Sequence, residues 1–418
     1  MPRAGVVSMD VPEAARSVPA LEGGAPVRST PLPPWPHFAA DEIEAVRSVL
    51  VSGKANYWTG KEGMSFEREF AEFVGTRYAV ALANGSVALE LALHALGIGP
   101  GDDVIVPSRS FMATASCVVL RGARPVFADV DATSGNVSAD TAKAVMTPRT
   151  RAIIAVHLAG WPCDMDPLLE LARTHNVKII EDCAQSHGAT DAGRVTGSIG
   201  DIGAFSFCQD KIMTTGGEGG MLVTNDTALW ERAWSYKDHG KSYDAVYNRD
   251  HPPGFRWLHE SFGTNWRMTE MQAAIGRRQL VKLPTWLSVR RRNARLLDGE
   301  LRDVPGLILR PQPLSHGHAY YKYYAFLDSA RLASAWNRQR IIEAVTAEGI
   351  PCAEGSCSEM YLEQAYADAG LAPETRLPVA RELGETSLML MVHPTMRERD
   401  VLDTAAAVRK VMRAAVQR

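Results

Sequence analysis

The sequence predicts an α/β fold in which a mostly parallel central sheet is flanked by helices, followed by a smaller C-terminal α/β domain. Three observations support this prediction. Between about residues 78 and 225, short apolar or β-branched runs alternate with helical patterns, which is the order of β–α–β units. The chain has 418 residues, more than one core ordinarily holds. After this stretch the pattern changes to longer helices.

The predicted elements follow one another in a regular order. The strand patterns are YAVALA, DVIVP, PVFADV, AIIAVHL and VKIIED, and between them stand helical patterns such as SVALELALHAL, FMATASCVVLRG and PLLELARTH. This β–α–β order predicts helices on both faces of the sheet. After AFSF and GGMLVTN come two longer helical patterns, TEMQAAIGRRQL and WLSVRRRNARLLDGEL, and we expect the second to bridge two domains.

We predict three parts of the chain. Residues 1–36 form a flexible N-terminal arm that becomes ordered near its Pro-Trp-Pro stretch, because they are rich in Ala, Gly, Ser and Pro without a sustained period. Residues 37–285 form a large domain, whose first helix is free to pack with the small domain. Residues 286–418 form that small domain, with HAYYKYYAFL as a strand and IIEAVTAEG and VLDTAAAVRKVMRAAV as helices.

Composition excludes several classes of function. A net charge of -3 with 22% charged residues gives no large single-sign field, so we expect no nucleic-acid or membrane partner. The six cysteines have no C-x-x-C spacing, so we expect reduced thiols and no metal site. No run approaches the about 20 apolar residues of a membrane span, and the N-terminus lacks the apolar core of a secretory signal. We therefore expect a cytoplasmic protein.

Two segments carry the chemistry. IIEDCAQSHGA places Asp182 directly after an apolar strand, where open parallel sheets bind ligands. AFSFCQDKIMTTGGEGG places Ser206 in an apolar run and Lys211 before a glycine-rich loop. A lysine held in such a cleft loses solvation, which lowers its pKa and leaves a neutral amine able to form a Schiff base. Taken singly, Asp182 is typical of a turn and Lys211 of a surface residue.

The segment ANGSVALELAL supplies a place for a phosphate. It predicts a strand, the turn Asn84-Gly85-Ser86 and then a helix whose first turn includes Ser86. Backbone N–H groups and hydroxyls at a helix start bind phosphate, although the same pattern alone is ordinary turn and N-cap chemistry. Together with Asp182, Ser206 and Lys211 it meets each requirement of a pyridoxal phosphate site.

These segments resemble the DegT/DnrJ/StrS family of pyridoxal-phosphate-dependent sugar aminotransferases, which have fold type I, across roughly residues 32 to 415. The resemblance implies that Lys211 forms the Schiff base with pyridoxal 5′-phosphate. It also implies that Asp182 faces the pyridine nitrogen and that Gln185 lies near the ring hydroxyl. Lys211 and Asp182 are thus the expected catalytic residues.

The same resemblance implies the remaining cofactor contacts. Ser86, Ser206 and the Gly85 backbone would bind the phosphate, and Phe111 of SRSFMATA would stack on the ring. Asn265 of GTNWRM would reach the phosphate site of a neighbouring subunit. The expected assembly is therefore a homodimer with shared active sites.

The expected reaction moves an amino group from an amino acid, glutamate or glutamine, to a keto-sugar that is nucleotide-linked in most of the family. A cyclitol ketone of the scyllo-inosose kind or a cyclic aminodehydroquinate-type precursor is the alternative acceptor. Two departures from the family pattern leave the identity of the acceptor open. They are Cys208-Gln209-Asp210 before the lysine and GSCSEMYLE near the C-terminus.

Three other interpretations fit parts of this pattern less well. Pyridoxamine-dependent sugar dehydratases replace the lysine with histidine, so Lys211 argues against them. A non-catalytic cofactor-binding regulator would carry a DNA-binding segment or a strongly basic region, and neither is apparent. A structural accident, in which EDCAQ and GGEGG are merely turns, conflicts with four cofactor elements in the expected order. Residues that could line the substrate pocket, but that are as often packing residues, are His157, Trp161, His187, His239, His316, Tyr320, Lys322 and His393.

Overall fold

A seven-stranded sheet forms the centre of the computed structural model, which describes residues 17–417. The strands lie in the order β1-β9-β8-β5-β4-β2-β3. β9 is antiparallel to both of its neighbours, and the other strands run parallel to one another. The bounds are β1 (Tyr78–Leu82), β2 (Asp103–Pro107), β3 (Arg124–Ala128), β4 (Thr150–Val156), β5 (Lys178–Asp182), β8 (Ile202–Ser206) and β9 (Gly220–Thr224). The predicted α/β class with a mostly parallel sheet is confirmed.

Helices cover both faces of this sheet, because apolar side chains point alternately to each face along the buried strands. On one face, Ile154 and its neighbours pack against α4 (Gly85–Ala95), α5 (Ala113–Leu120) and α8 (Thr227–Tyr236). On the other face, Ile153 and Phe205 belong to clusters that include α3 (Glu62–Val74) and α7 (Met165–His175). The remaining helices of this region are α2 (Ala40–Ser52), α6 (Ala139–Ala144) and α9 (Tyr243–Tyr247).

The C-terminal part is a smaller α/β unit. An antiparallel sheet in the order β10-β12-β14-β13 packs against α11 (Arg338–Ala347) and α14 (Glu398–Ala415). A three-stranded sheet, in the order β11-β6-β7, pairs a strand of this region with a hairpin of the large sheet's region. The bounds are β6 (Thr190–Asp191), β7 (Arg194–Val195), β10 (Leu307–Ile308), β11 (His316–Gly317), β12 (Tyr323–Leu327), β13 (Cys352–Ala353), β14 (Ser387–Leu390), α12 (Gln364–Asp368) and α13 (Pro378–Thr386).

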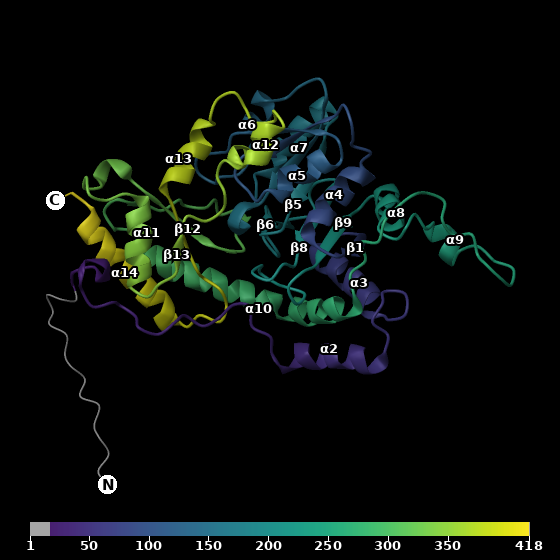
Figure 1. Cartoon of the computed structure of the whole chain (residues 1–418), viewed down its shortest axis with the longest axis horizontal. Helices are drawn as coiled ribbons and strands as arrows, with labels where there is room; N and C mark the ends of the chain where they lie inside the picture. The colour runs from purple at the N-terminus through teal and green to yellow at the C-terminus, as the bar shows by residue number, and fades with distance from the viewer. Residues whose placement is uncertain (1–16, 418) are drawn as a thin grey trace, which may run out of the picture.

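One long helix, α10 (Glu270–Leu301), connects the two regions along the length of the molecule (Figure 1). The two helical patterns seen in the sequence are one helix that continues through Pro284. An interior proline costs about 3 kcal/mol, but Leu283 and Leu287 on either side of it are buried in the core. Leu297 is buried in the C-terminal core. The helix therefore contributes to both cores, as a bridging helix would.

The described part of the predicted arm is held by specific contacts. The backbone N–H groups of Ala20 and Val27 donate to the Glu348 carboxylate at 2.8 and 2.9 Å. Arg28 forms an ion pair with Asp400 at 2.7 Å. Ordered contacts thus begin well before the Pro-Trp-Pro stretch. The sequence did not indicate them, because composition does not reveal which backbone donors find a partner. The arm's first 16 residues lie outside the described part.

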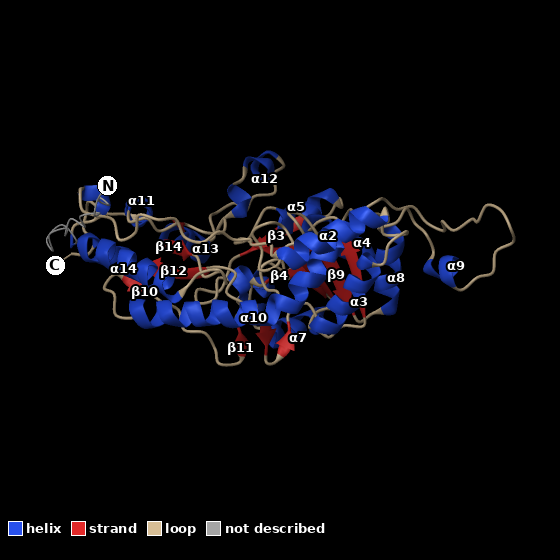
Figure 2. Cartoon of the chain, turned by 90° about the horizontal axis from the view of Figure 1, so that it is seen from below, coloured by secondary structure: helices blue, strands red, loops and turns tan. Residues whose placement is uncertain are grey.

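A segment formed by residues 241–262, which carries α9, extends away from the body (Figures 1 and 2). Its aromatic side chains are largely exposed, with Phe255 at 76%, Trp257 at 84% and Phe262 at 98%. Large apolar side chains gathered on a projecting segment are typical of a contact surface. From Ser17 to Gln417, no helix combines the length and apolar character needed to cross a membrane.

Candidate active site

A cavity of about 740 Å³ lies at the carboxyl edge of the large sheet. Asp182 is the last residue of β5 and Ser206 the last of β8, so adjacent parallel strands deliver both side chains to the same edge. The cavity brings together most of the predicted site, and its lining includes Gly85, Ser86, Phe111, Asp182, Gln185, Ser206 and Lys211. Asn265 does not line it.

Asp182 is a buried carboxylate whose two oxygens are held separately. Oδ1 accepts the Ala184 N–H at 3.1 Å, and Oδ2 accepts the Thr114 hydroxyl at 2.9 Å. The Thr114 hydroxyl lies 2.9 Å from that of Ser110, so a short hydroxyl chain fixes the carboxylate. Burial raises the pKa of Asp182 above its ordinary value, although these hydrogen bonds and the Lys211 ammonium oppose the shift. Such a carboxylate gains most from a cationic partner.

The start of α4 forms a cradle against the end of β8. The Asn84 side chain caps the helix by accepting the Val87 N–H at 3.0 Å, while the first-turn N–H groups have no partner within the helix. A Cβ on Gly85 would lie 2.5 Å from the Ser206 Cβ, so only glycine lets the helix approach this strand so closely. Helix N–H groups and the hydroxyls of Ser86 and Ser206 thereby line one end of the cavity.

Lys211 lies in the turn that follows β8, and its side chain is 16% exposed. Its Nζ is 4.0 Å from Asp210 Oδ1 and 4.9 Å from the centre of the Tyr321 ring. Burial alone would raise the pKa of Asp210, but Lys211, the Tyr321 hydroxyl and Lys322 together hold it below its ordinary value. The Trp35 Nε1–H donates to the Lys211 carbonyl at 2.9 Å, which fixes the backbone of the lysine.

Phe111 and Gln185 both line the cavity, but Phe111 is exposed and Gln185 is buried. Phe111 is 69% exposed, so its ring is available to cover a flat ligand. Gln185 is buried, and its Oε1 accepts the Ala159 N–H at 2.7 Å. Because the amide oxygen is occupied, the Nε2 group is left to donate toward the cavity.

Asn265 is exposed on the surface, at the base of the 241–262 segment. Its Oδ1 accepts the Arg267 N–H at 3.4 Å, and its backbone pairs with Asp238. Asp238 is buried and bonds both Arg267 and the Trp58 Nε1–H. The loop that carries Asn265 is therefore held firmly, while the side chain lies outside the cavity lining of its own subunit.

None of the side chains predicted from the sequence as candidates for the substrate pocket lines the cavity around Lys211. Trp161, Tyr320 and Lys322 line a second cavity nearby. Among the histidines, His393 stacks on Trp35 and so has a packing role. The sequence analysis did not identify Thr114. Its position four residues after Ser110 in SRSFMATA, one helical turn away, could have indicated that the two hydroxyls lie together.

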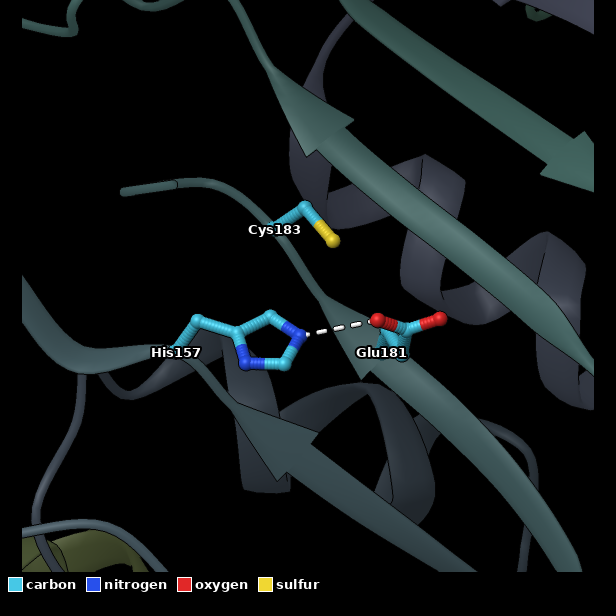
Figure 3. A group of neighbouring side chains, drawn as sticks. All are labelled: His157, Glu181 and Cys183. Carbon is cyan, nitrogen blue, oxygen red and sulfur yellow. Dashed lines mark hydrogen bonds and ion pairs between the residues drawn. The ribbon is translucent and has the colours of Figure 1, made fainter. Parts of the chain in front are cut away.

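His157, Glu181 and Cys183 form a compact buried group (Figure 3), and the last two flank Asp182 in the sequence. The Cys163 N–H donates to His157 Nδ1 at 3.0 Å, so Nε2 carries the proton and donates to Glu181 at 3.0 Å. Glu181 also accepts three backbone N–H groups of the 197–200 loop. Burial raises the pKa of the Cys183 thiol well above its ordinary value. These hydrogen bonds hold His157 and Glu181 in place.

An α/β subunit of this topology, with a lysine and a buried carboxylate at the carboxyl edge of its sheet, has the architecture of fold-type-I aminotransferases. The model of the DegT/DnrJ/EryC1/StrS aminotransferase family matches residues 36–409. The chain belongs to this family, and it is an aminotransferase.

Known proteins agree with this assignment. The crystal structure of the aminotransferase from Psychrobacter cryohalolentis has a TM-score of 0.91 at 53% identity, covering 92% of this chain and 100% of that one. GDP-perosamine synthase of Caulobacter vibrioides is 38% identical, over 84% of this chain and 91% of its own. L-glutamine:2-deoxy-scyllo-inosose aminotransferase of Streptomyces kanamyceticus is 35% identical, over 94% and 96% of the two chains. The predicted fold and family are confirmed.

Proposed function

We propose that this protein binds pyridoxal 5′-phosphate on Lys211 and transfers an amino group from glutamate or glutamine to a nucleotide-linked keto-sugar, in amino-sugar, natural-product or polysaccharide biosynthesis. The observation that carries the proposal is one cavity lined by the buried Asp182 carboxylate, the Lys211 amine and the start of α4. The names of the relatives support the substrates, since one contains GDP and another contains L-glutamine.

The cavity fits the cofactor at each end. A phosphate requires backbone N–H groups and hydroxyls, and the α4 cradle supplies both. Gly85 allows this cradle to lie against Ser206, because a Cβ on residue 85 would lie 2.5 Å from the Ser206 Cβ. A protonated pyridine nitrogen requires a carboxylate, and the buried Asp182 has no direct ion pair within residues 17–417. These features support the assignment of cofactor contacts to Gly85, Ser86 and Ser206.

When bound, pyridoxal phosphate supplies an aldehyde that condenses with amines and a ring that withdraws electrons. Asp182 holds a proton at the ring nitrogen, because a desolvated carboxylate interacts strongly with an adjacent cation. Lys211 Nζ would move a proton from the α-carbon of the amino donor to the C4′ carbon of the cofactor, and in the opposite direction with the acceptor. Phe111 would cover the ring and exclude water, and Gln185 Nε2 would donate to the ring hydroxyl.

A cyclitol ketone is the second candidate acceptor. The observation that favours it is the similarity to the scyllo-inosose aminotransferase, which spans 94% of this chain. The two acceptors differ in charge, because only the nucleotide-linked sugar carries a diphosphate. A panel that contains both kinds of ketone therefore distinguishes them. The regulator alternative conflicts with membership of an aminotransferase family.

The proposal includes a homodimer whose active sites are shared through Asn265. Its support is the exposed position of Asn265 at the base of a projecting aromatic segment, outside the cavity lining of its own subunit. We also propose that the enzyme acts in the cytoplasm without a nucleic-acid or membrane partner. The net charge of -3 supports this part of the proposal.

The Lys211→Ala variant tests the central claim. We expect it to lose both the absorbance of lysine-bound cofactor and transamination, because the amine is removed without opening a large apolar cavity. Lys143→Ala, on the exposed face of α6, is the control and should behave as the parent protein. Circular dichroism checks that both variants fold. Unchanged turnover in Lys211→Ala would refute the proposal.

The acceptor is identified with the aminated form of the enzyme. Pyridoxamine-loaded protein is offered a panel of nucleotide-linked keto-sugars and cyclitol ketones, and the return of the lysine-bound cofactor absorbance is followed. We expect the nucleotide-linked ketones to react. A response only to cyclitol ketones would select the alternative acceptor.

A further inference from the structure

Asp210 precedes Lys211 in the turn that follows β8, in a stretch where the sequence departs from the family pattern. Both residues line the cavity at the carboxyl edge of the large sheet. The Asp210 side chain is 55% exposed, against 16% for Lys211. A carboxylate beside an amine favours the charged form of that amine. The position of Asp210 therefore bears on how the proposed catalytic amine holds a proton.

The Asp210 carboxylate lies between two lysines and a tyrosine. Its Oδ1 is 4.0 Å from Lys211 Nζ, and its Oδ2 is 4.0 Å from Lys322 Nζ. Oδ2 also accepts the Tyr321 hydroxyl. The Tyr321 ring contacts both amines, with Lys211 Nζ 4.9 Å and Lys322 Nζ 4.8 Å from its centre. The two ammonium groups thus share one carboxylate and one aromatic ring as partners.

The protonation states of Asp210 and Tyr321 follow from these contacts. Burial acts to raise the pKa of Asp210, but Lys211, the Tyr321 hydroxyl and Lys322 together hold that pKa below its ordinary value. Burial and the adjacent Asp210 carboxylate raise the pKa of the Tyr321 hydroxyl above its ordinary value. At neutral pH Asp210 is therefore ionised, and Tyr321 keeps the proton that it donates. Asp210 acts on Lys211 through its charge and not as a proton carrier.

Two further cations make this carboxylate necessary. Burial lowers the pKa of Lys322, and the charges of Arg290 and Lys211 lower it further, whereas Asp210 opposes the shift. Arg290 of α10 is 1% exposed, and burial lowers its pKa to about 9 while Tyr321 and Asp210 oppose this. Within the described chain, Arg290 Nε and Nη2 have no hydrogen-bond partner. Asp210 is thus the negative charge that offsets three cations, and removal of such a partner leaves them uncompensated.

Other titratable side chains also interact with the Lys211 amine or line its cavity. They come from β5, from the segment that follows it and from the turns after β8, and they are Asp182, His187, Cys208 and Glu218. Asp182 is the proposed partner of the ring nitrogen. Burial lowers the pKa of His187 to about 3, so this ring is uncharged at neutral pH. Within residues 17–417, Asp210 is the one carboxylate that lies within 4.0 Å of Lys211 Nζ.

We propose that Asp210 is a positioning residue that sets the basicity of the Lys211 amine, an inference that deepens the proposed function and rests on it. In the proposed reaction, Nζ takes a proton from the α-carbon of the amino donor and becomes an ammonium. It then gives this proton to the C4′ carbon and is neutral again. The Asp210 carboxylate stabilises the ammonium against the charges of Lys322 and Arg290, and the Tyr321 hydroxyl holds the carboxylate in place.

Cyanate treatment of the cofactor-free, full-length protein tests the inference without the reaction. Cyanate is small enough to enter the cavity and carbamoylates neutral amines, so mass spectrometry of the Lys211 peptide across a pH series gives the midpoint of its reaction. Asp210→Asn should move this midpoint about one pH unit lower, the small end of the effect of a nearby opposite charge, because water screens a half-exposed carboxylate. Asp210→Glu keeps the charge and should restore part of the shift. Asp140→Asn, at an exposed position of α6, is the matched control and should keep the parental midpoint.

Kinetics of the cofactor-loaded protein give a second measurement. At a pH above both midpoints, Asp210→Asn should lower kcat about ten-fold, a part of the about 10²–10⁴-fold that a positioned base contributes, with little change in the KM for the amino donor. Circular dichroism confirms folding of each variant. An unchanged midpoint or an unchanged kcat in Asp210→Asn, or an equal shift in Asp140→Asn, would overturn the inference. Failure of the parent protein to show the absorbance of lysine-bound cofactor would instead refute the proposed function.

Discussion

Asp182 lowers the stability of the cofactor-free protein when it is ionised, and it also has a proposed chemical role. Burial raises the pKa of its carboxyl above the ordinary value, so the folded chain holds this proton more tightly than the unfolded chain does. The contribution of Asp182 to the stability of the cofactor-free protein therefore decreases as the pH rises from the ordinary pKa through the raised one. Once ionised, the carboxylate destabilises the cofactor-free fold, and a cationic ligand offsets this effect.

Asp182→Asn should separate the two roles. The amide retains hydrogen-bonding contact with Ala184 and Thr114 but cannot stabilise a protonated ring nitrogen. We expect turnover to fall by at least about 10²-fold, the scale of losing one preorganised electrostatic contact, while the cofactor is retained. The melting temperature of the cofactor-free variant should be equal to or higher than that of the parent. Near-parental turnover would leave Asp182 as a turn residue.

The sequence anticipated the main groups of the site but not the contacts that position them. Asp182, Ser206 and Lys211 could be placed because each follows or ends an apolar strand, and strand ends share one edge of a parallel sheet. The support of Lys211 by Trp35 could not, because 176 residues separate them and no periodic pattern links them. The hydrogen bond from Arg109 to Ser358 likewise could not, because 249 residues separate them.

The start of α4 shows how an element depends on one residue. Gly85 lets the helix approach β8, where a Cβ would lie 2.5 Å from the Ser206 Cβ. Gly85→Ala should displace the helix start, at a cost of about 1–3 kcal/mol from overpacking. We expect the Kd for pyridoxal phosphate to rise at least about ten-fold, measured by fluorescence titration of the cofactor-free protein.

Gly299→Ala is the control for the glycine-to-alanine substitution at residue 85. Gly299 lies in α10, where an added Cβ would meet nothing within 4 Å. Gly299→Ala should keep the parental Kd and raise stability slightly, because alanine has the higher helix propensity. A parental Kd in Gly85→Ala would show that the cradle does not bind the phosphate.

Periodicity in the sequence predicted the strands of the large sheet better than the short strands outside it. Alternating or continuous apolar runs located β1 through β5, because buried strands need apolar residues. The short strands β6, β7 and β11 were not predicted, since two-residue strands carry no period. Pro284 divided α10 into two apparent helices, although buried leucines on both sides keep it continuous.

The whole molecule presents a surface that one subunit does not use. Phe255, Trp257 and Phe262 are exposed on the 241–262 segment, and Asn265 is exposed at its base. A self-complementary contact across a two-fold axis would cover such a surface in both copies at once. If Asn265 then completes the partner's phosphate site, cofactor binding and dimerisation are linked, and pyridoxal phosphate stabilises the dimer by mass action.

Mixing two inactive variants tests the shared site. In a mixed dimer of Lys211→Ala and Asn265→Asp subunits, one site contains both defects and the other contains neither. The aspartate disables a site because its charge repels the phosphate. We expect each mixed dimer to recover up to about half of the activity of a parental dimer, because two equivalent sites are divided across a two-fold interface. Each variant alone is the control, and tagged subunits confirm exchange. Complete exchange without recovered activity would place Asn265 in the site of its own subunit.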